Sequence, residues 1–201
     1  MLLCVSFVAC TRTPELQPLS ADAVILAFGD SLTYGTGAAK GEDYPSSLEQ
    51  LTDHRVINAG IPGEVSGAGL KRLPALLRQH RPEMVILCHG GNDILRRQDL
   101  QRTRENIQRM IDLVRASGAE VVLVGVPQFG LFLSIAPFYT DLAERNGIPI
   151  DASALSDILK NPSLKSDQIH PNAAGYRRLA ERLAELLAAS GAVENIRHSS
   201  N

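Results

Sequence analysis

Val24-Ile25-Leu26-Ala27-Phe28-Gly29-Asp30-Ser31 is an apolar run that stops abruptly at three turn-forming residues. Such a run is typical of a strand buried on both faces of a parallel sheet. Gly29 and Asp30 favour a sharp turn at the carboxyl end of the strand. We therefore expect Ser31 at the start of the next helix, in the crevice where open parallel sheets bind their ligands. Taken by itself, this serine is either a helix N-cap or a nucleophile.

Further apolar runs predict strands at residues 55–58, 84–88, 121–126 and 148–150. Helices are expected between them, several with apolar residues at helical spacing, at residues 46–52, 70–77, 99–116, 142–146 and 172–189. Pro74 falls inside the second of these patterns and predicts a late helix start or a kink. Pro171 is expected in the first turn of the last helix.

Strands that are apolar throughout and alternate with helices indicate a parallel sheet covered on both sides. We predict an α/β fold of three layers, α/β/α and flavodoxin-like, with a mostly parallel sheet of about five strands. The domain is expected to span residues 23–189, with residues 190–201 as a C-terminal tail. No repeat, low-complexity tract or linker to a second domain is visible in the sequence.

The first 22 residues read as a signal-like or lipoprotein leader followed by a tether. Residues 1–10 are mostly apolar, whereas residues 11–20 are polar and contain two prolines. Phe7-Val8-Ala9-Cys10 is similar to a bacterial lipoprotein cleavage box, in which the cysteine carries the lipid. We expect a periplasmic or membrane-anchored bacterial lipoprotein with a possible lipid anchor at Cys10. No basic residue precedes the apolar run, so the leader is expected to be truncated, and a plain secretory signal or an irregular cytosolic N-terminus remain as alternatives.

The composition excludes several classes of function. The 201 residues include 20 basic and 22 acidic side chains without a basic block, so nucleic-acid binding has little electrostatic support. No internal apolar run approaches the roughly 18 residues that span a bilayer. Cys88 is the single cysteine of the predicted domain, and we expect it to be buried and unpaired. The sequence has no cysteine and histidine spacing typical of zinc sites and no phosphate-binding loop, so we expect no metal and no cofactor. Separately, we expect a monomer.

Polar residues follow several of the predicted strands, at Gly29-Asp30-Ser31, residues 58–63 and residues 90–93. Asp167 and His170 follow the last short strand at a greater distance. Because the carboxyl ends of parallel strands share one edge of a sheet, these turns are expected to converge. The chain order Ser…Asp…His is also that of many sheet-based serine hydrolases, although order alone is weak evidence.

These four blocks, in this order, resemble the SGNH (GDSL-type) hydrolases, and most closely their thioesterase I/lysophospholipase L1 and arylesterase branch. The resemblance implies that Ser31 is the nucleophile, His170 the general base and Asp167 the carboxylate that orients the imidazole. It also implies an oxyanion hole made of the backbone N–H groups of Ser31 and Gly63 and the side-chain amide of Asn92.

Each of these residues also has a purely structural interpretation. Gly63 competes with Gly60 for the oxyanion role, and the family spacing Asn-Ala-x-x-x-Gly favours Gly63. Either glycine is also explained by a turn with positive φ. Asn92 is alternatively a helix cap, and His170 a residue of a helix-entry turn. We interpret His89, a lone histidine at a strand end, as structural.

The sequence thus predicts a serine ester hydrolase that forms an acyl-enzyme with small or medium-chain esters, thioesters or lysophospholipids. The alternatives are a carbohydrate O-acetylesterase and a non-catalytic module that binds an anion at the helix start. Acyl chains are expected to contact Ile94 and Leu95, after the Asn92 turn, and Phe129 and Leu131, after the third strong strand.

Overall fold

The computed structural model describes residues 13–128, 133–194 and 196. Its central sheet has the strand order β2-β1-β3-β4-β7, and every neighbouring pair is parallel. The strands are β1 (Val24–Gly29), β2 (Arg55–Gly60), β3 (Met84–Cys88), β4 (Glu120–Val124) and β7 (Ile150–Asp151). This order is that of the flavodoxin-like fold. The predicted fold class is therefore confirmed.

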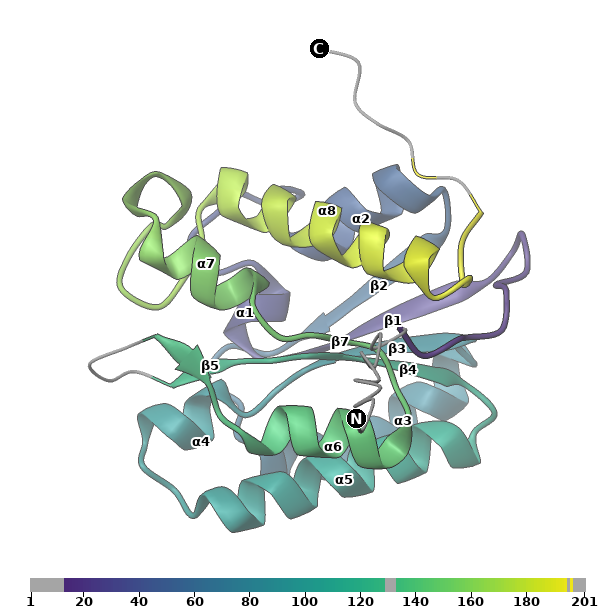
Figure 1. The fold of residues 1–201 in the computed structure, drawn as a ribbon, viewed down its shortest axis with the longest axis horizontal. Coiled ribbons are helices and arrows are strands. Elements are labelled where there is room, and N and C mark those ends of the chain that lie inside the picture. The colour runs from purple at the N-terminus through teal and green to yellow at the C-terminus, as the bar shows by residue number, and fades with distance from the viewer. Residues whose placement is uncertain (1–12, 129–132, 195, 197–201) are drawn as a thin grey trace, which may run out of the picture.

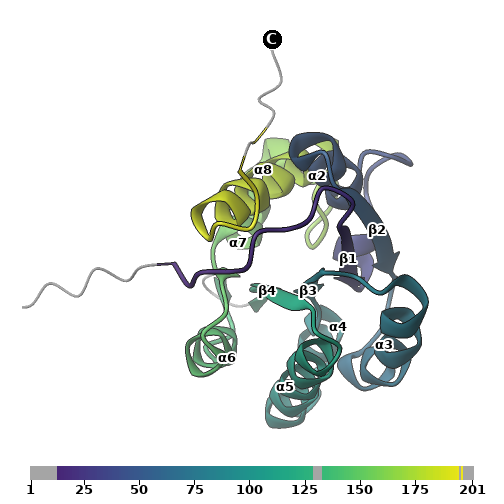
Figure 2. The same ribbon diagram turned by 90° about the vertical axis from the view of Figure 1, so that its right-hand side faces the viewer.

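Helices cover both faces of the sheet, which gives three layers (Figures 1 and 2). One face carries α2 (Tyr44–Thr52), α7 (Ala154–Lys160) and α8 (Ala173–Ala189), and the other carries α3 (Ser66–His80), α5 (Leu100–Ala116) and α6 (Phe138–Asn146). The short helices α1 (Ser31–Tyr34) and α4 (Gly91–Leu95) begin within two or three residues of the ends of β1 and β3. Both therefore lie at the carboxyl edge of the sheet.

Burial explains why these runs became strands. All five residues of β3 are fully buried, and β1 is buried except at its first residue. The edge strand β2 is only half buried, which matches its shorter apolar run. Cys88, at the end of β3, is buried and forms no disulfide, as its place in the apolar run predicts.

The structure corrects several local expectations. Helix α3 starts at Ser66 and contains Pro74, so the proline neither delays nor ends the helix. The side chain of Asn172 caps α8 by accepting a hydrogen bond from the N–H of Gly175, so Pro171 precedes the cap and is not in the first turn. The predictions also lacked helix α7, the 3₁₀ turn η1 (Pro162–Leu164) and a small antiparallel pair of strands, β5 (Pro127–Gln128) and β6 (Ser134–Ile135).

The segment before β1 packs against the end of the domain. Leu16 is buried in the core, and its N–H donates a hydrogen bond to the carbonyl of Ser190 (2.8 Å). The N–H of Leu19 donates to the carbonyl of Ala192 (2.9 Å). Part of the expected tether therefore lies on the domain. Cys10, the possible lipid anchor, is outside the described residues, and no helix within the described ranges is long and apolar enough to cross a membrane.

Candidate active site

The serine at the end of β1 faces a histidine that is 139 residues away in sequence. The Oγ atom of Ser31 lies 3.1 Å from Nε2 of His170. The side chain of Asp30, and not that of Ser31, caps helix α1, because it accepts the N–H of Leu32 (3.1 Å). Asp30 is therefore the N-cap residue, and Ser31 is not. The hydroxyl of Ser31 is free to form a hydrogen bond with the imidazole of His170.

Asp167 completes a chain of three side chains. Its Oδ2 lies 2.8 Å from Nδ1 of His170, and its Oδ1 accepts the backbone N–H groups of Ile169 and His170 (both 2.8 Å). Partial burial raises the pKa of Asp167, but the hydrogen bonds from His170 and Ile169 outweigh this effect and hold the pKa below its usual value. An ionised Asp167 accepts a hydrogen bond from Nδ1–H of His170, and the proton stays on the ring. Nε2 is then the acceptor for the Ser31 hydroxyl.

The candidate oxyanion donors come from the turns after β1, β2 and β3. Ser31 and Asn92 line one small pocket together with His170, whereas Gly63 is not among its lining residues. Gly63 is exposed and has φ +77°. One N–H of the Asn92 amide donates to the carbonyl of Glu64 (3.0 Å), and its second N–H remains for another acceptor.

The two glycines after β2 differ in what they touch. A Cβ on Gly60 would lie 2.1 Å from the backbone nitrogen of Tyr34, so a side chain there would collide with helix α1. The N–H of Gly60 also donates to Oδ1 of Asn58 (3.0 Å). Among the described residues the N–H of Gly63 has no such acceptor. The structure thus gives Gly60 a packing role and leaves the N–H of Gly63 available.

The same pocket has an apolar wall. The lining residues are Leu32, Leu95, Val126, Pro127, Leu159 and Ile169, beside the polar residues already named and Gly91. Leu95 was expected there, whereas Ile94 packs against the core and does not line the pocket. Phe129 and Leu131 lie outside the described residues. Val126 and Pro127 lie two and three residues after the end of β4. Their place at the carboxyl end of a predicted strand was therefore a signal from which the sequence could have identified them.

Other sequence features have structural roles. Gly63-Glu64-Val65-Ser66-Gly67 is similar to a Gly-x-Ser-x-Gly nucleophile elbow but has one extra residue before the serine. Ser66 is fully buried, and its hydroxyl donates a hydrogen bond to Asp93 (2.6 Å). It is therefore inaccessible as a nucleophile. Within the described part of the chain, no group of three or more histidine, cysteine, aspartate or glutamate residues is placed to hold a metal ion.

Residues 27–178 match the model of the GDSL-like lipase/acylhydrolase family. The chain belongs to this family. An arylesterase of Vibrio mimicus is 33% identical over 178 residues, which cover 83% of this chain and 89% of that protein. Thioesterase 1/protease 1/lysophospholipase L1 of Escherichia coli K12 is 31% identical over 84% of this chain and 85% of its own length.

Solved structures of related sequence share the fold of this chain. The crystal structure of TesA superposes with a TM-score of 0.72 and 29% identity, covering 82% of this chain and 97% of that one. The psychrotrophic esterase EstA from Pseudoalteromonas sp. superposes with a TM-score of 0.71 and 26% identity over the same shares. The relatives are named as esterases and thioesterases, so the chain is a hydrolase of ester bonds.

Proposed function

We propose that this hydrolase cleaves small and medium-chain acyl esters or thioesters through an acyl-enzyme on Ser31. The observation that carries the proposal is the continuous chain of hydrogen bonds from Ser31 through His170 to Asp167, at 3.1 and 2.8 Å. In acylation the serine oxygen attacks the carbonyl carbon while Nε2 of His170 takes its proton. The imidazolium then gives that proton to the leaving alcohol or thiol. In deacylation a water molecule attacks the acyl-enzyme by the same route, and Ser31 is regenerated.

Hydrolysis of chromogenic acetate, butyrate and octanoate esters by the purified chain tests this function. We expect turnover of all three esters, with kcat/KM rising with chain length. If the folded protein turned over none of the three esters, the result would contradict the proposal and favour the non-catalytic module. Turnover limited to acetate would favour the carbohydrate O-acetylesterase.

Asn92→Ala is expected to lower kcat by about 10²–10³, the usual effect of removing one oxyanion donor. KM should change little, because the negative charge develops only in the transition state. Steady-state kinetics with the butyrate ester measures both constants, and a thermal melt checks that the variant is folded. A change in kcat below threefold would show that Asn92 acts only as a structural residue of α4.

The apolar pocket predicts the preference for chain length. A buried CH₂ contributes about 0.8 kcal/mol, which is close to fourfold in kcat/KM per carbon. We expect kcat/KM to rise from acetate to at least hexanoate esters. Leu95→Trp, which enlarges an exposed lining residue, should shift the optimum to a shorter chain.

Leu100→Trp is the matched control, because Leu100 is exposed to a similar degree but lies on α5 and does not line the pocket. Its chain-length profile should equal that of the wild type. A Leu95→Trp profile that also equals the wild type would remove Leu95 from the acyl site.

A further inference from the structure

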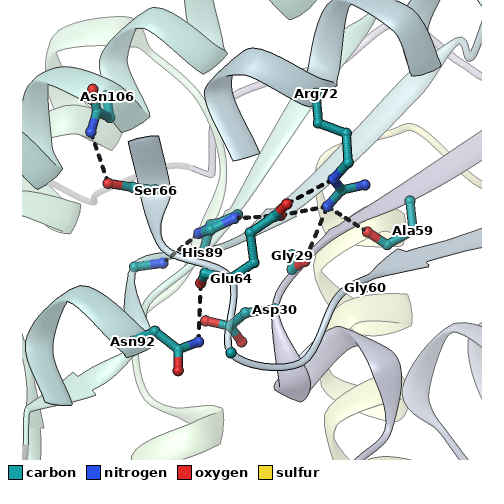
Figure 3. Close-up of polar contacts among 12 residues, drawn as sticks. Gly29, Asp30, Ala59, Gly60, Glu64, Ser66, Arg72, His89, Asn92 and Asn106 are labelled. Atoms are coloured by element: carbon teal, nitrogen blue, oxygen red, sulfur yellow. Dashed lines mark hydrogen bonds and ion pairs between the residues drawn. The ribbon is translucent and has the colours of Figure 1, made fainter. Parts of the chain in front are cut away.

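Directly after Gly63, the side chain of Glu64 turns into the protein and lies between Arg72 and His89 (Figure 3). Nε of Arg72 donates to Oε1 of Glu64 (3.0 Å), and Nη2 of Arg72 donates to Oε2 (2.6 Å). Nε2 of His89 lies 3.1 Å from Oε2. The side chains of Glu64 and His89 are 7% and 0% exposed. Both carboxylate oxygens are therefore held from inside the molecule.

The two partners of Glu64 are themselves fixed. The N–H of Gly90 donates to Nδ1 of His89 (2.9 Å), which assigns the ring proton to Nε2 and makes the neutral ring a donor to Glu64. The guanidinium of Arg72 lies 4.4 Å from the ring centroid of Phe28 and donates to the carbonyl of Ala59 (3.1 Å). The cluster thus contacts β1 through Phe28, β2 through Ala59 and the turn after β3 through Gly90.

Glycine 69 makes room for this cluster. A Cβ at Gly69 would lie 2.4 Å from Nε2 of His89 and 3.2 Å from Oε2 of Glu64. The histidine ring is fully buried and cannot move aside freely. Helix α3 therefore needs a glycine here for the Glu64–His89 contact to form.

The backbone of Glu64 connects the cluster to two candidate oxyanion donors. Its carbonyl accepts one N–H of the Asn92 amide (3.0 Å), as Figure 3 shows. Gly63 directly precedes Glu64 in the loop between β2 and α3, so the position of the Gly63 N–H depends on how Glu64 is held. The far end of this loop is also held, because Asp93 accepts the N–H and the hydroxyl of Ser66 (2.8 and 2.6 Å).

Electrostatics keeps Glu64 charged. Burial raises the pKa of this carboxyl, but the hydrogen bonds from His89 and Arg72 and the positive charge of Arg72 outweigh it and lower the pKa to about 2. The charged form is thus the one that holds the loop at neutral pH.

We propose that Glu64 is a positioning residue for the oxyanion hole. Held by Arg72 and His89, it aims the Asn92 amide and the Gly63 N–H at the carbonyl oxygen of the substrate. This inference rests on the proposed acyl-enzyme function, and it assigns the oxyanion hole a support that is buried away from the reacting atoms.

Glu64→Gln keeps the size of the side chain but removes its charge. It also places an amide NH₂ group opposite the N–H donors of Arg72 or His89. We expect kcat to fall at least about tenfold, part of the effect of one oxyanion donor, with KM nearly unchanged. Introduced into Asn92→Ala, the same change should lower kcat by a smaller factor than in the wild type, because the part of its effect that acts through Asn92 is already lost. Equal losses in both backgrounds would overturn the proposal. Glu105→Gln, an exposed glutamate of α5 whose carboxylate accepts from Gln101, is the control and should leave kcat unchanged.

A pair of glycine variants tests the cluster without touching Glu64. Gly69→Ala should lower kcat at least about tenfold, as Glu64→Gln does, because the added Cβ prevents the Glu64–His89 contact. The control is Gly67→Ala, two residues earlier on α3, where the nearest atom to a Cβ is Nδ2 of Asn106 at 3.7 Å, an ordinary contact. It should keep the wild-type kcat. A folded Gly69→Ala variant with wild-type kcat would contradict the proposal.

Nuclear magnetic resonance provides a readout that does not depend on turnover. In the wild type, the Asn92 amide proton bonded to Glu64 should exchange slowly with solvent. In Glu64→Gln we expect that exchange to become at least tenfold faster. Unchanged exchange at Asn92, together with an unchanged Gly63 N–H signal, would refute the positioning role. A wild type that hydrolyses no ester would refute the proposed function instead, while this measurement would still decide the position of the amide.

Discussion

Ser31→Ala is expected to lower kcat for ester hydrolysis by about 10⁶. The hydroxyl is the atom that attacks the substrate, and a methyl group offers no nucleophile in its place. The fold should be retained, because the bond from this hydroxyl goes to His170 and the cap of α1 is provided by Asp30. We expect the free energy of unfolding to change by about 1 kcal/mol or less. Steady-state kinetics and denaturant unfolding of the same preparation measure both quantities.

Ser163→Ala serves as the matched control. Ser163 is exposed, and its hydroxyl donates to Asn161 outside the pocket. This variant should keep the wild-type kcat. A folded Ser31→Ala variant that turns over esters within tenfold of the wild type would end the account of Ser31 as the nucleophile.

Asp167→Asn is expected to lower kcat by about 10⁴. An asparagine can still accept the backbone N–H groups of Ile169 and His170 through its oxygen. Its NH₂ group then faces Nδ1 of His170 and donates to it, which moves the ring proton to Nε2. A protonated Nε2 cannot accept the proton of Ser31, so the base is lost while the loop keeps its shape. Pre-steady-state kinetics should show that acylation is the slowed step.

Asp157→Asn is the control for this change. Asp157 is an exposed residue of α7 whose carboxylate lies 3.8 Å from Nζ of Lys160. A surface ion pair of this kind contributes little to stability, and Asp157 does not line the pocket. The variant should therefore keep the wild-type kcat. If Asp167→Asn lowered kcat less than tenfold, Asp167 would be a loop residue and His170 would be oriented by the backbone alone.

The fold could be predicted where a continuous apolar run in the sequence marks a buried strand. The run Met84–Cys88 is apolar throughout, and β3 has these same bounds because it lies in the middle of the sheet. Helix α7 was missed because a seven-residue helix gives few turns of periodic signal, although its Leu159 reaches the pocket. The two-residue strands β5 and β6 pair only with each other, so their existence depends on tertiary contacts.

The site could be predicted in part for the same physical reason. Ser31 and Asn92 directly follow strands that are recognisable from sequence, and topology brings such strand ends to one edge. Asp167 and His170 were suggested by residue type and order, and their contact was implied by the family resemblance. The pairing of Glu64 with His89 was not predicted, because 25 residues separate them and no local pattern records the contact. His89 was expected to be structural, and its buried contact with Glu64 agrees with that expectation.

The most direct test of the acyl-enzyme mechanism is the site of covalent labelling by an alkyl fluorophosphonate. The serine oxygen attacks phosphorus and fluoride leaves, so the adduct marks the nucleophile. We predict one adduct per chain, located by peptide mapping on Ser31, formed in parallel with the loss of esterase activity and absent from Ser31→Ala. Complete loss of activity with the adduct on another residue, or an adduct on Ser31 in a chain that still hydrolyses esters at the wild-type rate, would contradict the mechanism.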